Sequence, residues 1–242
     1  MSMEQKYKAK EYVVAFIDVL GAKKKIQQEV NASLNIVHET YNEAIDFLST
    51  LYSGKIDILK PQIKIFSDNI VVAVPTDIKG RPAALMSVMI YAGMIQHHFL
   101  QHKYLVRGGI SLGDFFIDDV MLWGTALIRA YEIESTIAIY PRIILDPNLV
   151  GAVKLFESKG LQEWVSQDVD SLLFVNYIQD RIMKEKESFL PLLLYRIEEA
   201  EEMLIDADGN LKVQQKILWH LNYLNDCLKN SEQNDKATTS IC

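Results

Sequence analysis

The chain has 242 residues, of which 49% are hydrophobic, and its formal net charge is −7. This composition is typical of a globular protein with a sizeable core, and the acidity argues against a broad nucleic-acid-binding surface, which is normally basic. The two cysteines, Cys227 and Cys242, show no metal-binding spacing and no disulfide framework, which favours a reducing compartment. The first residues do not resemble a signal peptide, and the most apolar helical stretch, residues 84–95, is shorter than the roughly 20 residues that cross a bilayer. We therefore expect a cytoplasmic protein that binds neither nucleic acid nor a membrane.

Two hydrophobic segments near the start of the chain each lead into an aspartate. Residues 12–17 form a continuous apolar run that favours a strand buried on both faces, and Asp18 follows it directly. Residues 63–74 contain two β-branched runs joined by Ser67-Asp68-Asn69, which predicts a β-hairpin because Asp and Asn bond the backbone of tight turns. Turn chemistry alone explains Asp68, but two strands that deliver carboxylates to one end of a sheet predict a site for two metal ions.

The hydrophobic periodicity of the following segments predicts an α+β fold. Helices are predicted over residues 32–52, 83–102, 124–139 and 146–158, and further strands over residues 104–112, 118–123, 142–145 and 172–178. The first six elements follow the order β-α-β-β-α-β, which matches a ferredoxin-like arrangement. In that arrangement the first strand lies beside the hairpin, so we expect Asp18 to lie near Asp68.

The C-terminal part of the chain has a different pattern. Residues 181–229 alternate charged and apolar side chains at helical spacing, with a polar turn at residues 206–210, which predicts two helices. The last residues are polar and predict disorder. We expect one domain over residues 1–180, a helical extension over residues 181–230 and a disordered tail over residues 231–242.

Basic residues and glycines in the predicted strands add candidate site residues. Arg107 precedes Gly108 and Gly109 within a strand, where glycines mark the close approach of another backbone or of a ligand. Arg107 suits an oxyanion such as phosphate, which a guanidinium contacts in two-pronged fashion, and Lys64 on the hairpin is a second candidate cation. The plain alternative for both residues is a surface charge. The backbone N–H groups of residues 19–22, at the entry to a helix, are candidates to hold phosphates.

Four short motifs, in this order, resemble the class III nucleotidyl cyclases over residues 12–145. They are Phe16-x-Asp18-Val19-x-Gly21, then Lys64-Ile65-Phe66-Ser67-Asp68, then Arg107-x-Gly109-Ile110-x-x-Gly113, then Trp123-Gly124 followed by Ala130, Glu134 and Ser135. Further details are similar to the bacterial pyrimidine cyclases of the Pycsar antiphage systems, which make cyclic UMP or cyclic CMP. These details are Phe66-Ser67-Asp68-Asn69, Arg107-Gly108-Gly109-Ile110-Ser111, Ala130-Tyr131-x-x-Glu134 and Tyr140-Pro141-Arg142-Ile143.

The resemblance implies a fold, a reaction and a set of site residues. It implies that residues 1–180 form a ferredoxin-like class III cyclase catalytic domain, an antiparallel sheet with packed helices, that converts UTP to cyclic UMP and diphosphate. The product would be a diffusible second messenger in antiphage defence, which activates a downstream effector. The enzyme would be a homodimer with shared active sites, each holding two Mn²⁺ or Mg²⁺ ions. The implied metal ligands are Asp18, Val19 and Asp68, the implied substrate contacts are Phe16, Leu20, Gly21, Lys64, Arg107 and Met121, and the implied catalytic residue is Arg129.

Two departures from the family pattern leave alternatives open. Met121 stands where purine cyclases have the polar residue that helps to select the base, which favours a pyrimidine. The asparagine and arginine of the family's catalytic helix fall on Ile128 and Glu132, but Arg129 lies one helical turn before Glu132 and can carry the same charge. The alternatives are a cytidylate cyclase, a purine cyclase, and an inactive cyclase-like module that binds a nucleotide without turning it over.

Overall fold

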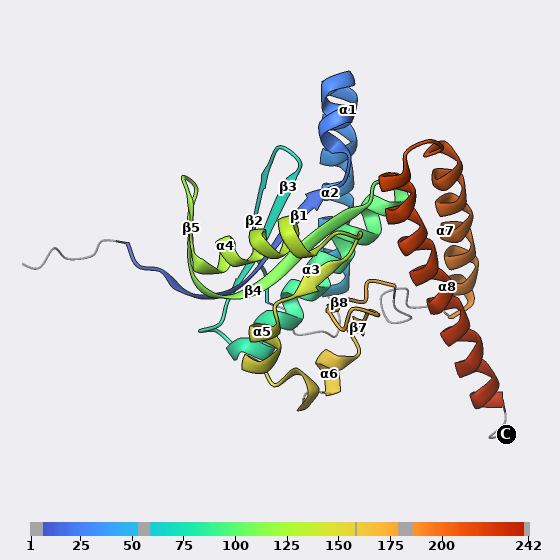
Figure 1. Cartoon of the computed structure of the whole chain (residues 1–242). Helices are drawn as coiled ribbons and strands as arrows, with labels where there is room; N and C mark the ends of the chain where they lie inside the picture. The colour runs from blue at the N-terminus through green and yellow to red at the C-terminus, as the bar shows by residue number, and fades with distance from the viewer. Residues whose placement is uncertain (1–6, 53–58, 158, 179–185, 240–242) are drawn as a thin grey trace, which may run out of the picture.

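The computed structural model describes residues 7–52, 59–157, 159–178 and 186–239, and it arranges them as one sheet with helices packed on both faces (Figure 1). The strands are β1 (Lys10–Val19), β2 (Gln62–Phe66), β3 (Asn69–Pro75), β4 (Val106–Ile117), β5 (Leu122–Gly124), β6 (Ile143–Leu145), β7 (Val165–Gln167) and β8 (Leu173–Val175). The helices are α1 (Ala22–Gln28), α2 (Val30–Tyr52), α3 (Gly80–Gln101), α4 (Thr125–Glu132), α5 (Pro147–Ala152), α6 (Lys159–Gln162), α7 (Lys186–Asp206) and α8 (Leu211–Thr239). A π-helix, η1 (Ile133–Ile137), follows α4, and a 3₁₀ helix, η2 (Leu155–Glu157), follows α5.

The strand order confirms the predicted α+β fold. The sheet has the order β2-β3-β1-β4-β6-β8-β7, and β5 pairs with β4 outside this path. All neighbours are antiparallel except β4 and β6, which are parallel. The order β2-β3-β1-β4, with α2 and α3 in the connections, is the ferredoxin-like arrangement. The sequence did not predict β7 and α6, because elements of three or four residues are too short to show periodicity.

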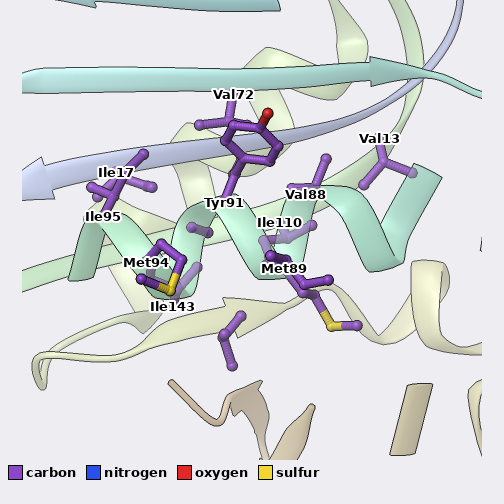
Figure 2. Close-up of a cluster of buried hydrophobic side chains, with 14 of the residues drawn as sticks. Val13, Ile17, Val72, Val88, Met89, Tyr91, Met94, Ile95, Ile110 and Ile143 are labelled. Carbon is purple, nitrogen blue, oxygen red and sulfur yellow. The ribbon is translucent and has the colours of Figure 1, made fainter. Parts of the chain in front are cut away.

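Helix α3 lies at the centre of the main hydrophobic core, between α2 and one face of the sheet. Figure 2 shows Val88, Tyr91 and Ile95 of α3 among the side chains of the sheet, with Ile17 and Val72 close by. With 22 residues, α3 is longer than the predicted apolar stretch, and it is the one helix in the described residues whose length and composition suit a membrane span. However, 89% of its most apolar window is buried within the protein, as in the core helix of a globular domain.

Helix α4 covers the opposite face of the sheet, where it packs on β1 and β4. A Cβ atom at Gly109 would lie 2.6 Å from Cβ of Ile133 and would overlap with the carbonyl oxygen of Ala130. The predicted close approach at this glycine is therefore that of a helix to the strand. The sequence predicts one helix as far as residue 139, but the structure changes to the π-helix η1 after Glu132. A π-turn shifts the side chains that follow it around the helix axis, and such turns are frequent at functional sites.

Helices α7 and α8 pack side by side at one end of the sheet (Figure 1). They share an apolar cluster with Leu100 at the end of α3 and Leu105 before β4, to which α7 contributes Ile197 and α8 contributes Ile217. This cluster attaches the C-terminal helices to the sheet.

The C-terminal end of α8 differs from the sequence prediction. The helix continues to Thr239, so most of the segment expected to be a disordered tail is helical. Polar composition did not distinguish the two states, because Glu, Gln, Lys and Ala also favour helix. The expected boundary at residues 180–181 lies outside the described residues, and the division into domains stays a prediction.

Candidate active site

Asp18 and Asp68 lie at the same edge of the sheet. Asp18 is close to the end of β1, where its register partners are Asn69 on β3 and Arg107 on β4. Asp68 is in the β2–β3 turn, and its backbone oxygen accepts a hydrogen bond of 3.1 Å from the Val19 N–H. The β-hairpin therefore brings the two aspartates together, as the order of the elements predicts.

Arg107 connects Asp18 to a third carboxylate that the sequence analysis did not include among the site residues. Its Nε atom donates to Oδ2 of Asp18 at 3.3 Å, and its Nη2 atom lies 2.7 Å from Oε1 of Glu134. Glu134 belongs to η1, and its side chain is only 4% exposed. The available signal was its place in the resemblance to cyclases, but a helix of ordinary pitch does not predict which way the side chain points. The guanidinium thus joins β1, β4 and the π-helix.

The carboxylates of this cluster are costly to ionise. Burial raises the pKa of Asp18, the charge of Asp68 raises it further, and Arg107 opposes both effects. Burial likewise raises the pKa of Glu134, again opposed by Arg107. Oε1 of Glu134 has a charge contact with Arg107 but no hydrogen bond within the described residues. Negative charge in this cluster is therefore incompletely compensated, which favours the binding of cations.

The donor atoms at this edge fit divalent ions that arrive with a phosphate ligand. Among the described residues, no group of three or more His, Cys, Asp or Glu side chains forms a complete metal cage. Mg²⁺ commonly binds one or two carboxylates and takes its other oxygen ligands from water and substrate phosphates. The pair Asp18 and Asp68 matches that pattern, and a bound cation would offset the burial, and the smaller effect of the Asp68 charge, that raise the pKa of Asp18.

The predicted phosphate-binding turn after β1 is only partly available. The N–H groups of Val19 and Leu20 donate to the backbone oxygens of Asp68 and Leu105, at 3.1 and 2.8 Å, so they hold the fold together. The Leu20 side chain packs against the apolar cluster of α7 and α8. Gly21 has φ of 78°, which a glycine adopts without strain, and it precedes the short helix α1. The expectation that residues 19–22 all offer free N–H groups is therefore wrong for Val19 and Leu20.

Lys64 on β2 contacts the β4–β5 loop, which also carries Met121. Nζ of Lys64 is 3.3 Å from Oδ1 of Asp119, two residues before Met121. Met121 lines a pocket of about 430 Å³, together with aromatic side chains that include Trp123. In the register of the sheet Lys64 is opposite Val71, which is opposite Phe16 on β1. Lys64, Val71 and Phe16 thus lie side by side across three strands, and Phe16 is two residues before Asp18 on β1.

Phe16 is buried on the face of the sheet that α4 covers. Its ring makes edge contact with Tyr131 of α4, with centroids 5.4 Å apart, and it is tilted against Phe66 at 6.1 Å. The Phe16 ring thus contacts both α4 and β2.

Within one subunit, the structure does not bring Arg129 to Asp18. Its Nε donates to Oδ2 of Asp146 at 2.9 Å, and a weaker contact of 3.4 Å reaches Glu132. Asp146 is buried and also caps α5 by accepting from the Asn148 N–H. The Asp146 N–H donates to the Ile110 oxygen, three positions along β4 from Arg107. The sequence could not predict this pairing, because Asp146 has no local relation to Arg129.

Comparison with known proteins identifies no family and only distant structural neighbours. No family model and no curated protein matches this sequence. The guanylyl cyclase domain of the RhoGC fusion protein from the aquatic fungus Blastocladiella emersonii is 13% identical and has a TM-score of 0.49, over 70% of this chain and 94% of that chain. The adenylate/guanylate cyclase/hydrolase from Silicibacter pomeroyi is 19% identical and has a TM-score of 0.45, over 69% of this chain and 95% of that chain. Similarity at this level supports no conclusion about this chain, so the case for a function rests on the side chains described above.

Proposed function

We propose that this protein is a nucleotide cyclase that converts a nucleoside triphosphate, preferably UTP, to the 3′,5′-cyclic monophosphate and diphosphate. The observation that carries the proposal is the placement of Asp18 and Asp68 at one sheet edge, with Arg107 paired to Asp18. The order of the four sequence motifs supports the same reaction. Arg129 supplies the argument for the alternative, because an arginine held by Asp146 suits a module that binds a nucleotide without turning it over.

In this reaction the ribose 3′-oxygen attacks the α-phosphorus, the bond to the β-phosphate oxygen breaks, and the hydroxyl proton passes to solvent. Asp18, Asp68 and the Val19 carbonyl would hold two Mn²⁺ or Mg²⁺ ions, which when bound lower the pKa of the hydroxyl and neutralise charge on the leaving diphosphate. Arg107 Nε, Nη1 and Nη2 contact Asp18, the Ala138 oxygen and Glu134, which leaves one N–H on each Nη atom to donate to phosphate oxygens. Burial of the cluster strengthens these charge interactions relative to water.

The base preference rests on Lys64 and Met121. The Lys64–Asp119 pair is exposed and worth little, so Lys64 is free to donate to a base. Uracil offers two carbonyl oxygens and cytosine offers one, and the Met121 side chain makes no strong polar contact. We therefore propose UTP as the preferred substrate, CTP as the next, and ATP and GTP as poor substrates.

Substituting Lys64→Met is expected to lower the ratio of kcat/KM for UTP over CTP by about tenfold, the value of one polar contact of about 1.4 kcal/mol. The measurement is competition among the four triphosphates with Mn²⁺, with separation of the cyclic products. Lys10→Met is the matched control, since Lys10 also pairs with an exposed aspartate, Asp77, at 2.9 Å. Fastest cyclisation of ATP or GTP by the wild-type protein would refute the pyrimidine assignment, and fastest cyclisation of CTP would refute the argument from Lys64.

We further propose that the enzyme is a homodimer in which Arg129 of one subunit serves the site of the other. Several large side chains on the outer side of α4 and β5 are exposed, among them Trp123 at 69%, Ile128 at 59% and Tyr131 at 52%. Such a patch beside the site is suited to a partner surface. A two-fold dimer through this face would place the same residues of both subunits in contact.

A mixture of two inactive variants tests this arrangement. Asp68→Asn lacks the metal site, and Arg129→Lys keeps a positive charge for Asp146 but loses the two-pronged guanidinium. Equal mixing, after subunit exchange, should restore about a quarter of the wild-type activity, because half of the dimers then have one intact site. If the subunits exchange and no activity returns, the shared site is excluded.

The sequence resemblance extends the proposal to a cyclic pyrimidine nucleotide that acts as a second messenger in antiphage defence. A cell that carries the wild-type protein and its effector should accumulate the cyclic nucleotide on phage infection. Unchanged levels of that nucleotide, in infected cells that are protected, would contradict this role.

A further inference from the structure

Helix α8 reaches the candidate active site through the turn of residues 216–219. Ile217 in this turn is buried in the apolar cluster against which Leu20, two residues after Asp18, also packs. Trp219 fixes the same turn, because its Nε1 donates to Asp168 Oδ2 at 2.7 Å and its ring stacks on Tyr140 with centroids 5.9 Å apart. Three independent contacts thus hold this part of α8 against the edge of the sheet.

Asp168, which accepts the hydrogen bond from the Trp219 indole, is itself held in place by an arginine beside the sheet. The buried Arg142, next to β6, pairs with both Asp168 and Asp170. The Arg142 backbone oxygen accepts from the Gly108 N–H at 3.1 Å, beside Arg107. The position of α8 is therefore set by the same strands that carry the candidate site.

Lys216 belongs to this turn and lies within electrostatic reach of the site. Its charge interacts with Asp18 and Glu134, which attract it, and with Arg107, which repels it. The side chain is half-buried, and burial lowers its pKa from the ordinary value of 10.5. Within the described part of the chain, the ammonium group forms no hydrogen bond and no ion pair. A partly desolvated ammonium group without a partner is unfavourable unless an anion binds it.

We propose that Lys216 binds the phosphate chain of the substrate, so that α8 forms one wall of the active site. This inference rests on the proposed function and adds to it a residue outside the part of the chain that resembles cyclases. Divalent ions at Asp18 and Asp68 would repel Arg107 and Lys216, and a triphosphate is the ligand that compensates both sets of charges. A lysine ammonium binds phosphate as a point charge, which suits a side chain that reaches the site from a neighbouring helix.

The test measures binding of inorganic tripolyphosphate with Mg²⁺ by calorimetry, together with the kinetics of cyclisation. Lys216→Gln should weaken tripolyphosphate binding about tenfold and raise KM for UTP by a similar factor, as expected for one charge-assisted hydrogen bond. Lys216→Arg should restore most of the binding. Lys212→Gln is the control, because Lys212 is an exposed lysine one turn earlier on α8, and its effect should stay below twofold.

Several outcomes would overturn the inference. These are no binding of tripolyphosphate by the wild-type protein, unchanged binding by Lys216→Gln, or equal losses in the Lys216 and Lys212 variants. Melting curves identify a misfolded variant, and loss of a half-buried unpaired charge should leave the melting temperature unchanged or higher. If tripolyphosphate binding depends on Lys216 but no triphosphate is cyclised, the anion site is supported and the proposed function is refuted. If the wild-type protein cyclises UTP and Lys216→Gln has the same KM for UTP, the proposed function is supported and the role of Lys216 is refuted.

Discussion

Replacing Asp18 or Asp68 by asparagine is expected to abolish cyclisation, with a loss of about a thousandfold or more, because neither amide can replace the carboxylate that is proposed to hold the cations. Asparagine keeps the shape of the side chain, so the fold should survive. For Asp18 the sign of the stability change can be stated. Its pKa is raised by burial and by Asp68, so the ionised form is disfavoured in the folded protein and the neutral amide should unfold at the same or a higher temperature.

Turnover, melting temperature and circular dichroism are to be measured on the same preparations. Asp77→Asn serves as the control, since Asp77 pairs with Lys10 beside the opposite end of β1 and should keep full activity. Full activity in either Asp18→Asn or Asp68→Asn would exclude the proposed metal site. If a variant melts far below the wild type, its loss of activity is not informative. The test is then made on the wild-type protein, whose binding of Mg²⁺ should require nucleotide.

Arg107→Gln is expected to remove activity and also to lower the free energy of unfolding by about 2–3 kcal/mol. Arg107 is only 24% exposed, so removal of its guanidinium leaves the buried Glu134 carboxylate and the partly buried Asp18 carboxylate without their ion-pair partner. Asp18→Asn and Arg107→Gln should therefore both be inactive but differ in stability. Urea unfolding at neutral pH measures the difference.

The pH dependence of this loss has a definite sign. Arg107 lowers the pKa values of Asp18 and Glu134, which burial raises, so its removal raises both further. The folded state then binds protons more tightly than the unfolded state, and stability falls as pH rises above the ordinary carboxylate value of about 4.5. The deficit of Arg107→Gln should shrink on acidification towards that value.

The double variant Arg107→Gln with Glu134→Gln should recover most of the lost stability and none of the activity. Glu134→Gln removes the buried charge that lost its partner, whereas the proposed contact of Arg107 with phosphate is still missing. Equal stability of the single and double variants would show that the ion pair does not support the fold. Recovery of activity in the double variant would remove Arg107 from the site.

Much of the fold followed from local sequence patterns. The apolar runs before Asp18 and around Asp68 predicted the strands and the hairpin, and the order β-α-β-β-α-β then placed β1 beside β3, as the structure confirms. Gly109 also predicted a close approach, although the pattern could not tell a helix from a ligand. These inferences depend on short-range periodicity and on a rule of topology, which is why a single sequence is enough.

The remaining features of the site depend on long-range side-chain contacts, which a single sequence does not encode locally. Arg129 on α4 pairs with Asp146, the N-cap residue of α5, which is 17 positions later in the sequence. Glu134 reaches Arg107 from a π-turn, and no periodicity with 3.6 residues per turn predicts that direction. The approach of Lys216 depends on how α8 docks, which is set by contacts with residues between 20 and 178.

The most direct test of the proposed function is incubation of the wild-type protein with each of the four triphosphates and Mn²⁺, with mass analysis of the nucleotide and diphosphate products. The account predicts equal amounts of 3′,5′-cyclic UMP and diphosphate from UTP, and neither product with Asp18→Asn. Release of linear UMP, or the absence of any cyclic nucleotide from all four triphosphates, would contradict it.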